Sequence, residues 1–260
     1  LSIQVHPDDV QAQAAGEANG KTEAWYVLAA ETGARVALGP KRSMSAADLR
    51  ASVEEGRVSE AIQWLPAVTR DVFVVPAGTI HAIGADLAIV EIQQRSDITY
   101  RLFDYGRPRS LQVEEAIAIS TLSPAPMSTP AFPMSFGRSA VAVTQFFVLE
   151  RVELPAGTSW QVDARRETWV LALGGDIVIA GIPAGVGDAI FLHDDRAVLV
   201  VGGGDSLLLI AYAHDCPDPD LLRPLMAVPS LLGEPPAPVF ETPHRQVRTA
   251  APSVAEGSRR

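Results

Sequence analysis

Apolar and polar residues alternate over residues 1–5, and this period of two predicts a strand with one buried face. From Ser45, a candidate N-cap, the period becomes helical and predicts a helix that continues to about Leu65. Shorter helices are predicted from Pro7 to about Gly20 and over residues 113–119. Short apolar runs between turn residues predict further strands at residues 23–29, 34–38, 71–75, 80–83 and 87–93.

A second series of strands is predicted later in the chain, where Gly-rich turns separate apolar runs at short intervals. The runs lie at residues 146–154, 159–162, 168–173, 176–179, 189–192, 197–201 and 206–213. Many short strands with regular turns are typical of an all-β sandwich or barrel, so we expect a mainly β protein.

Proline-rich stretches predict how the chain is divided into domains. Residues 122–138 are a predicted linker between a first domain, residues 1–121, and a second β domain, residues 139–214. The first domain carries a predicted helical insertion at about residues 43–66. Residues 215–260 are rich in proline and predict a loosely held or disordered tail. Because Leu1 is not Met and the first strand begins at once, we expect that N-terminal residues are missing from this sequence.

Composition and charge narrow the class of protein. Apolar residues make up 47% of the chain and charged residues 20%, as in folded globular domains. No stretch approaches the roughly 20 apolar residues of a membrane-spanning helix. The net charge of −10 argues against a nucleic-acid partner, although a local group of Arg and Lys could still bind a small anion. The single cysteine, Cys216, excludes an internal disulfide and predicts a reducing, cytoplasmic location.

Four side chains in the first domain have the chemistry of metal ligands. Gln4 and His6 are two residues apart on a predicted strand and therefore share a face. Glu23 begins the next predicted strand, and His81 follows the turn at residues 76–78. Two imidazoles, a carboxylate and an amide oxygen suit a divalent ion such as zinc, with a position left for water or substrate. Each residue alone has a simpler explanation, as a core histidine or an exposed polar side chain.

Polar and charged residues are dense from Glu91 to Arg109, directly after an apolar strand. One interpretation is a solvated edge with Arg–Asp pairs. The other is the mouth of a binding site where Lys21, Arg101, Arg107 and Arg109 hold an anion. Composition alone does not separate these two interpretations.

These segments resemble the type I phosphomannose isomerases (mannose-6-phosphate isomerases). Four motifs occur in the order found in that family, and they cover Leu1 to about Leu122. The motifs are Leu-Ser-Ile-Gln-Val-His-Pro-Asp-Asp at 1–9, Gly-Lys-Thr-Glu-Ala-Trp-Tyr at 20–26, Val-Pro-Ala-Gly-Thr-Ile-His-Ala-Ile-Gly at 75–84, and Glu-Ile-Gln-Gln-x-Ser-Asp-x-Thr-Tyr-Arg at 91–101.

The resemblance implies a cupin (jelly-roll) β-barrel followed by a second, degenerate cupin-like β domain. It implies one Zn²⁺ per chain and the interconversion of mannose 6-phosphate and fructose 6-phosphate through an enediol(ate) intermediate. The implied zinc ligands are Gln4, His6, Glu23 and His81, and the implied catalytic arginine is Arg101.

Further roles follow as hypotheses from the placement of neighbouring residues. Lys21 lies two residues before Glu23, so both would face the cavity, and Lys21 is a candidate both for proton transfer and for substrate binding. Glu91 and a zinc-bound water are the other candidates for proton transfer. Ser2, Arg107 and Arg109 are candidate contacts to the phosphorylated hexose.

The chain departs from the family in three ways. The family has about a hundred residues before the first motif, Arg95 replaces a small polar residue, and the second β domain has His193 and His214 but no matching ligand set. The alternative function is a non-catalytic cupin that binds a sugar phosphate or a metal. A metal-dependent cupin oxygenase is less favoured, because such enzymes use two or three histidines and open iron positions, whereas Gln4 and Glu23 with Arg101 nearby indicate oxygen-rich sugar chemistry.

Overall fold

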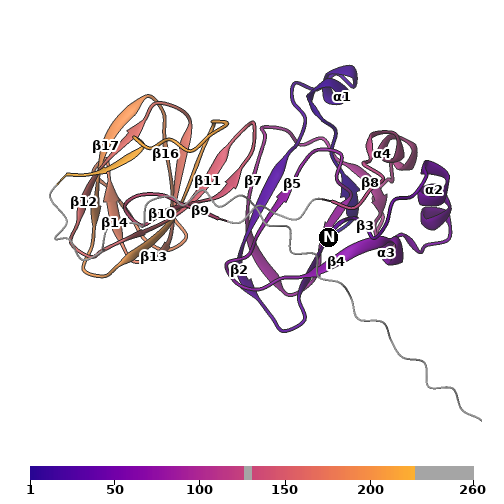
Figure 1. Cartoon of the computed structure of the whole chain (residues 1–260), viewed down its shortest axis with the longest axis horizontal. Coiled ribbons are helices and arrows are strands. Elements are labelled where there is room, and N and C mark those ends of the chain that lie inside the picture. Colours follow the sequence, from indigo (N-terminus) through magenta and orange to yellow (C-terminus); the bar gives the residue numbers. More distant parts are fainter. Residues whose placement is uncertain (126–130, 226–260) are drawn as a thin grey trace, which may run out of the picture. The chain divides into compact units, whose positions relative to one another are not determined.

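The computed structural model describes residues 1–125 and 131–225, which lie in one compact unit, and its secondary structure is mainly β as predicted. Most of the predicted tail, from residue 226, and part of the predicted linker lie outside the described residues. Among the described residues, no helix is both long and apolar enough to cross a bilayer. Figure 1 shows the order of the elements along the chain.

The strands of the first 103 residues form two antiparallel sheets (Figure 1). One has the order β4-β3-β6-β1-β8, and the other has the order β5-β2-β7. These strands are β1 (Ile3–Val5), β2 (Glu23–Ala30), β3 (Arg35–Pro40), β4 (Ile62–Pro66), β5 (Val72–Val75), β6 (His81–Ile83), β7 (Leu87–Gln93) and β8 (Tyr100–Phe103).

Strand β2 is buried on both faces, and this explains its uninterrupted apolar sequence after Glu23. Trp25 and Val27 pack against Val36 of β3 in the core between the two sheets. Ala24 and Tyr26 point to the opposite face and belong to a different core cluster. Glu23 is therefore a carboxylate at the start of a strand whose first five residues are buried.

Helices cover the outer face of the larger sheet through a core cluster that includes Leu49, Val58 and Ile117. The helices of this cluster are α2 (Ala46–Glu54), α3 (Val58–Ala61) and α4 (Val113–Ile119), whereas α1 (Asp9–Ala14) contributes no residue to it. Ser45 caps α2 as predicted, since its hydroxyl accepts a hydrogen bond from the backbone N–H of Asp48.

The expected helix to Leu65 is wrong in its last part. Helix α2 ends before Gly56, whose φ of +69° is a conformation that glycine adopts at helix ends. Ile62–Pro66 then forms strand β4, because it pairs with β3 in the register Val36↔Leu65. Ile62 and Leu65 fit helical spacing, but strand pairing decides their conformation.

The later strands form a second pair of antiparallel sheets with the orders β16-β13-β18-β11-β10-β9 and β15-β14-β17-β12-β19. One apolar core, including Trp160, Val170 and Leu199, lies between them. The paired sheets give the cupin-like β architecture that the sequence predicted. The strands are β9 (Phe132–Pro133), β10 (Arg138–Val143), β11 (Val148–Leu154), β12 (Ser159–Ala164), β13 (Thr168–Gly174), β14 (Ile177–Ile179), β15 (Ile182–Ala184), β16 (Ala189–Leu192), β17 (Asp195–Val201), β18 (Ser206–Tyr212) and β19 (Leu222–Pro224).

Two segments expected to be irregular contain strands. Phe132–Pro133 and the first residue of β10 fall within the expected linker, and Leu222–Pro224 of the expected loose tail pairs with β12. Leu221 and Leu222 are fully buried in the second core, which holds this part of the tail in place. The division into two domains at residues 121 and 139 stays a prediction.

Candidate functional site

Three segments of the larger first sheet and the start of β2 bring the predicted metal ligands together. Gln4 lies on β1 opposite His81 of β6, and on its other side it lies opposite Arg101 of β8. His6 follows β1 directly, and Glu23 is the first residue of β2. Residues that are up to 77 positions apart in the sequence therefore lie next to one another in the fold.

The side-chain atoms of these residues lie at the separations expected of ligands around one small ion. His6 Nε2 is 3.1 Å from Glu23 Oε1, and His81 Nε2 is 3.6 Å from Glu23 Oε2. Gln4 Nε2 is 3.5 Å from His6 Nε2 and 3.3 Å from His81 Nε2. Tetrahedral ligands with bonds of about 2.0–2.1 Å lie about 3.3 Å apart, so the spacing matches.

In both imidazoles the Nδ1 atom is paired with a backbone carbonyl. His6 Nδ1 donates to the carbonyl of Ile98, and His81 Nδ1 donates to the carbonyl of Thr79, both at 2.8 Å. These bonds fix the tautomer, so each Nε2 presents a lone pair to the cluster. Both histidines are about 1% exposed, which keeps the rings from turning.

The charge state of the cluster also suits a cation. Burial lowers the pKa of His81 to about 4, although Glu23 opposes the shift, so the ring is neutral at pH 7. Burial raises the pKa of Glu23, but its contacts with His6, His81 and Lys21 outweigh burial and hold that pKa far below its usual range. Glu23 is therefore a carboxylate beside His6 and the neutral imidazole of His81.

Ser2 supports the cluster from the same strand face. Its hydroxyl donates to Gln4 Oε1 at 2.8 Å, and its side chain is buried. An amide can present either its oxygen or its nitrogen by rotation, and the hydroxyl can pair with both. Ser2 is thus placed to orient Gln4, while its predicted contact to the substrate stays a prediction.

Lys21 and Glu91 lie beside the ligand carboxylate. Lys21 Nζ is 2.5 Å from Glu23 Oε1 and 3.7 Å from Glu91 Oε1. Burial and the charge of Glu23 raise the pKa of Glu91 to about 7. A carboxyl group with a pKa near 7 can both accept and donate a proton under physiological conditions.

Arg101 faces the same side of the sheet as its partner Gln4. Its Nε is buried, and no hydrogen-bond acceptor among the described residues reaches it. A buried guanidinium nitrogen without a partner costs folding free energy, and Arg101 therefore has an N–H that is available to an additional acceptor.

Arg107 and Arg109 are tied to Asp104 instead of contacting the ligand cluster. Arg109 donates to both carboxylate oxygens at 2.6 and 2.7 Å, and Arg107 lies 2.5 Å from Oδ1. This is the Arg–Asp pairing that the simpler interpretation of the segment predicted. A contact of either arginine with the substrate stays a prediction.

Two glycines position the site by allowing close backbone approach. A Cβ on Gly20 would lie 2.4 Å from the backbone carbon of Asp8, so the chain entering Lys21 and Glu23 needs glycine there. Gly78 has φ +82° and donates to the carbonyl of His6 at 2.7 Å, which holds the turn before His81 against β1.

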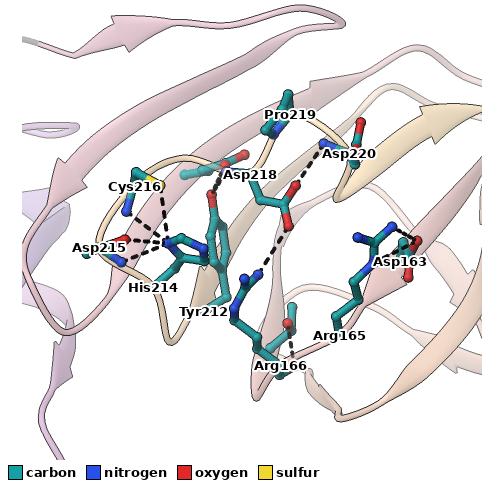
Figure 2. A network of polar contacts seen from close by, with 12 residues as sticks. Asp163, Arg165, Arg166, Tyr212, His214, Asp215, Cys216, Asp218, Pro219 and Asp220 are labelled. Atoms are coloured by element: carbon teal, nitrogen blue, oxygen red, sulfur yellow. Dashed lines mark hydrogen bonds and ion pairs between the residues drawn. The ribbon is translucent and has the colours of Figure 1, made fainter.

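A second group of metal-capable side chains is formed by His214, Asp215 and Cys216, and the sequence reasoning missed it although the residues are consecutive. In Figure 2 the backbone N–H groups of Asp215 and Cys216 and the Cys216 thiol meet His214 Nδ1. Asp215 and Cys216 are exposed, and the imidazole lone pair is already used. This group therefore differs from the buried cluster, whose Nε2 lone pairs face one another.

Comparison with known proteins agrees with the motifs. No family model matches the chain. The mannose-6-phosphate isomerase of Streptococcus mutans is 34% identical over 172 residues, which are 63% of this chain and 54% of the relative. A mannose-6-phosphate isomerase of Bacillus subtilis is 36% identical over 126 residues, which are 46% of this chain and 40% of the relative. The chain thus spans about half the length of the curated relatives it matches.

Solved structures share the fold. The crystal structure of the Bacillus subtilis mannose 6-phosphate isomerase has a TM-score of 0.70 and 23% identity, covering 81% of this chain and 71% of that one. A phosphomannose isomerase mutant from Salmonella typhimurium has a TM-score of 0.62 at 14% identity, with 82% and 76% covered. The chain is therefore similar in sequence and in fold to mannose-6-phosphate isomerases, as its four motifs indicated.

Proposed function

We propose that this chain carries a zinc-dependent aldose–ketose isomerase that interconverts mannose 6-phosphate and fructose 6-phosphate. The observation that carries the proposal is the convergence of His6, Glu23 and His81, whose ligand atoms lie within 4.8 Å of one another, with the Gln4 amide 3.3–3.5 Å from both imidazoles. Its relatives bear the name of that reaction, which adds support.

The four side chains fit a zinc ion by their chemistry as well as their spacing. Two imidazoles and one carboxylate are common zinc ligands, and rotation of the Gln4 amide would present its oxygen as the fourth. With a single anionic ligand, the ion keeps net positive charge. Zinc bound there would act as a Lewis acid toward the oxygens of an open-chain sugar.

The reaction moves a proton between C1 and C2, and negative charge develops on the adjacent oxygens. Arg101 is assigned to that charge, because its guanidinium remains protonated and its Nε lacks a partner in the described structure. A donor that is unpaired before the reaction and paired in the transition state lowers the barrier selectively.

Glu91 is assigned to proton transfer, and Lys21 to substrate oxygens. The raised pKa of Glu91 suits a group that takes a proton from one carbon and returns it to the next. Lys21, 8% exposed and held by Glu23, is a fixed positive charge beside Glu91 and can hold a hydroxyl or phosphate oxygen. Both assignments depend on the same arrangement of charges, which is formed by Glu23, Lys21 and Glu91.

A coupled assay of zinc-loaded protein with mannose 6-phosphate, detecting fructose 6-phosphate, tests the proposal. We expect turnover that disappears after chelation and returns with zinc. If the protein binds zinc and mannose 6-phosphate but never forms fructose 6-phosphate, the alternative of a non-catalytic cupin replaces the isomerase proposal. If iron supports activity and zinc does not, the assignment of the metal is wrong.

A further inference from the structure

Gln94 carries a buried amide that bridges the two segments on either side of Lys21. It directly follows β7, and it is 9% exposed. Its Oε1 accepts a hydrogen bond from the backbone N–H of Thr22 at 2.9 Å, and its Nε2 donates to Asp9 Oδ1 at 2.9 Å. A backbone N–H can only donate and a carboxylate can only accept, so these two partners fix the orientation of the amide.

These contacts hold the backbone both before and after Lys21. Asp9 Oδ1, the acceptor of the Gln94 amide, also accepts from the backbone N–H of Gly20 at 2.8 Å. The backbone N–H of Gln94 donates to the carbonyl of Thr22 at 3.1 Å. Thr22 is therefore held by Gln94 at its N–H and at its carbonyl, and Gly20 is held through Asp9.

Lys21 depends on this bridge more than the neighbouring ligand candidate does. Strand β2 begins at Glu23, which pairs with Val75 on one side and with Gln93 on the other. Lys21 precedes the strand, so the bonds made by Gln94 and Asp9 take the place of ladder hydrogen bonds around it. Loss of the Gln94 amide would thus release the backbone beside Lys21, while strand pairing keeps Glu23 in place.

The ammonium group of Lys21 has an exacting position. Its Nζ lies 2.5 Å from Glu23 Oε1 and 3.7 Å from Glu91 Oε1, and the residue is 8% exposed. A lysine stem is long and flexible, so its buried end is placed by the backbone from which it starts. In an active site, a misplacement of about 1 Å can lower a rate by about 10²-fold.

We propose that Gln94 is a positioning residue, which fixes the backbone around Lys21 and thereby the ammonium group between Glu23 and Glu91. This inference rests on the proposed function, in which Lys21 holds a substrate oxygen. It adds a residue that acts through Lys21 and not through a contact of its own with the sugar phosphate.

The variant Q94L tests the bridge, because leucine removes both the donor and the acceptor of the amide. We expect kcat/KM for mannose 6-phosphate to fall by about 10–100-fold in the zinc-loaded chain. Zinc content should stay unchanged, because Glu23 keeps its strand pairing. If Q94L does not fold, Q94E replaces it, since this variant keeps an acceptor for the Thr22 N–H and loses the donor to Asp9.

T158A is the matched control for the loss of one acceptor from a buried N–H. Thr158 Oγ1 accepts from Nε1 of the buried Trp160 at 2.8 Å, in the second pair of sheets. Circular dichroism confirms that each variant is folded. T158A should keep the kcat/KM of wild type, and an equal fall in T158A and Q94L would show that any comparable loss of stability lowers activity.

A double-mutant cycle with K21M separates a positioning role from a purely structural one. If Gln94 acts through Lys21, K21M/Q94L should have a kcat/KM within about threefold of that of K21M. The dissociation constant of mannitol 6-phosphate, which lacks a carbonyl and cannot isomerise, gives the same cycle by calorimetry where turnover is too slow to measure.

Two results overturn this inference while wild type remains an active isomerase. One is a double variant whose loss equals the product of the two single losses, because Gln94 and Lys21 then act independently. The other is folded Q94L with the kcat/KM of wild type. Zinc-loaded wild type that forms no fructose 6-phosphate overturns the proposed function itself.

Discussion

The substitution Arg138→Met should destabilise the protein strongly through a buried ion pair. Arg138 and Glu150 have fully buried side chains, and the guanidinium donates to both carboxylate oxygens at 2.7 and 2.8 Å. The same guanidinium donates to the carbonyl of Asp218 at 2.7 Å, and Tyr212 Oη donates to Glu150 at 2.5 Å. Methionine fills similar space but leaves the carboxylate with Tyr212 as its remaining donor among these groups.

The expected loss follows from the uncompensated buried charge. Removing one partner of a buried pair costs about 3–5 kcal/mol of unfolding free energy. For a unit of this size, each kcal/mol lowers Tm by about 2–4 °C, so we expect a fall of about 6–20 °C. Tyr212 shows the same environment, since burial and the Glu150 carboxylate raise the pKa of its hydroxyl.

Chemical denaturation and differential scanning calorimetry at pH 7 measure the change, and the triple variant R138M/E150L/Y212F is the control. Removing all three polar groups together should restore much of the lost stability, because no buried charge remains. A loss below about 1 kcal/mol in R138M, the value of an exposed ion pair, would refute the reasoning. Equal losses in R138M and the triple variant would show that packing, and not the buried charge, is responsible.

Three further changes test other parts of the account. R101A should lower kcat by about 10²–10³ with zinc content unchanged, and loss of zinc would instead make Arg101 structural. G20A should lower the free energy of unfolding by about 1–3 kcal/mol, since its Cβ would lie 2.4 Å from the Asp8 backbone. G203A is the control, because it has open space around it and should change that free energy little. Equal stabilities of the two variants in chemical denaturation would contradict this expectation. The Arg109 hydrogen bond lowers the pKa of Asp104. The free energy of unfolding of wild type should therefore exceed that of D104N by its full amount above the ordinary pKa of an aspartate, and this difference should vanish as the pH falls through the lowered pKa. A difference in thermal melting that grows in acid would contradict this expectation.

Much of the candidate site could be predicted from sequence because its candidate ligands lie on or beside short strands with strong local signals. The Gln4-x-His6 spacing puts both side chains on one strand face, and the turn before His81 contains the glycine that its φ requires. That these segments would meet followed from the resemblance and not from spacing, since the Gln4↔His81 pairing depends on strand order.

The parts that sequence reasoning missed depend on tertiary contacts. Ile62–Pro66 has helical spacing but pairs with β3, and Leu222–Pro224 looks like loose tail but buries its apolar residues against the second core. Local sequence patterns predicted whether most segments form a helix or a strand, and tertiary contacts with other elements determined the conformation of the rest.

The most direct test of the central claim is the zinc content of the purified, zinc-equilibrated chain by mass spectrometry, compared among wild type, H81A and C216S. We expect about one tightly bound zinc ion per chain in wild type and in C216S, and close to none in H81A. Undiminished zinc in H81A, or its loss in C216S, would contradict a metal site built from Gln4, His6, Glu23 and His81.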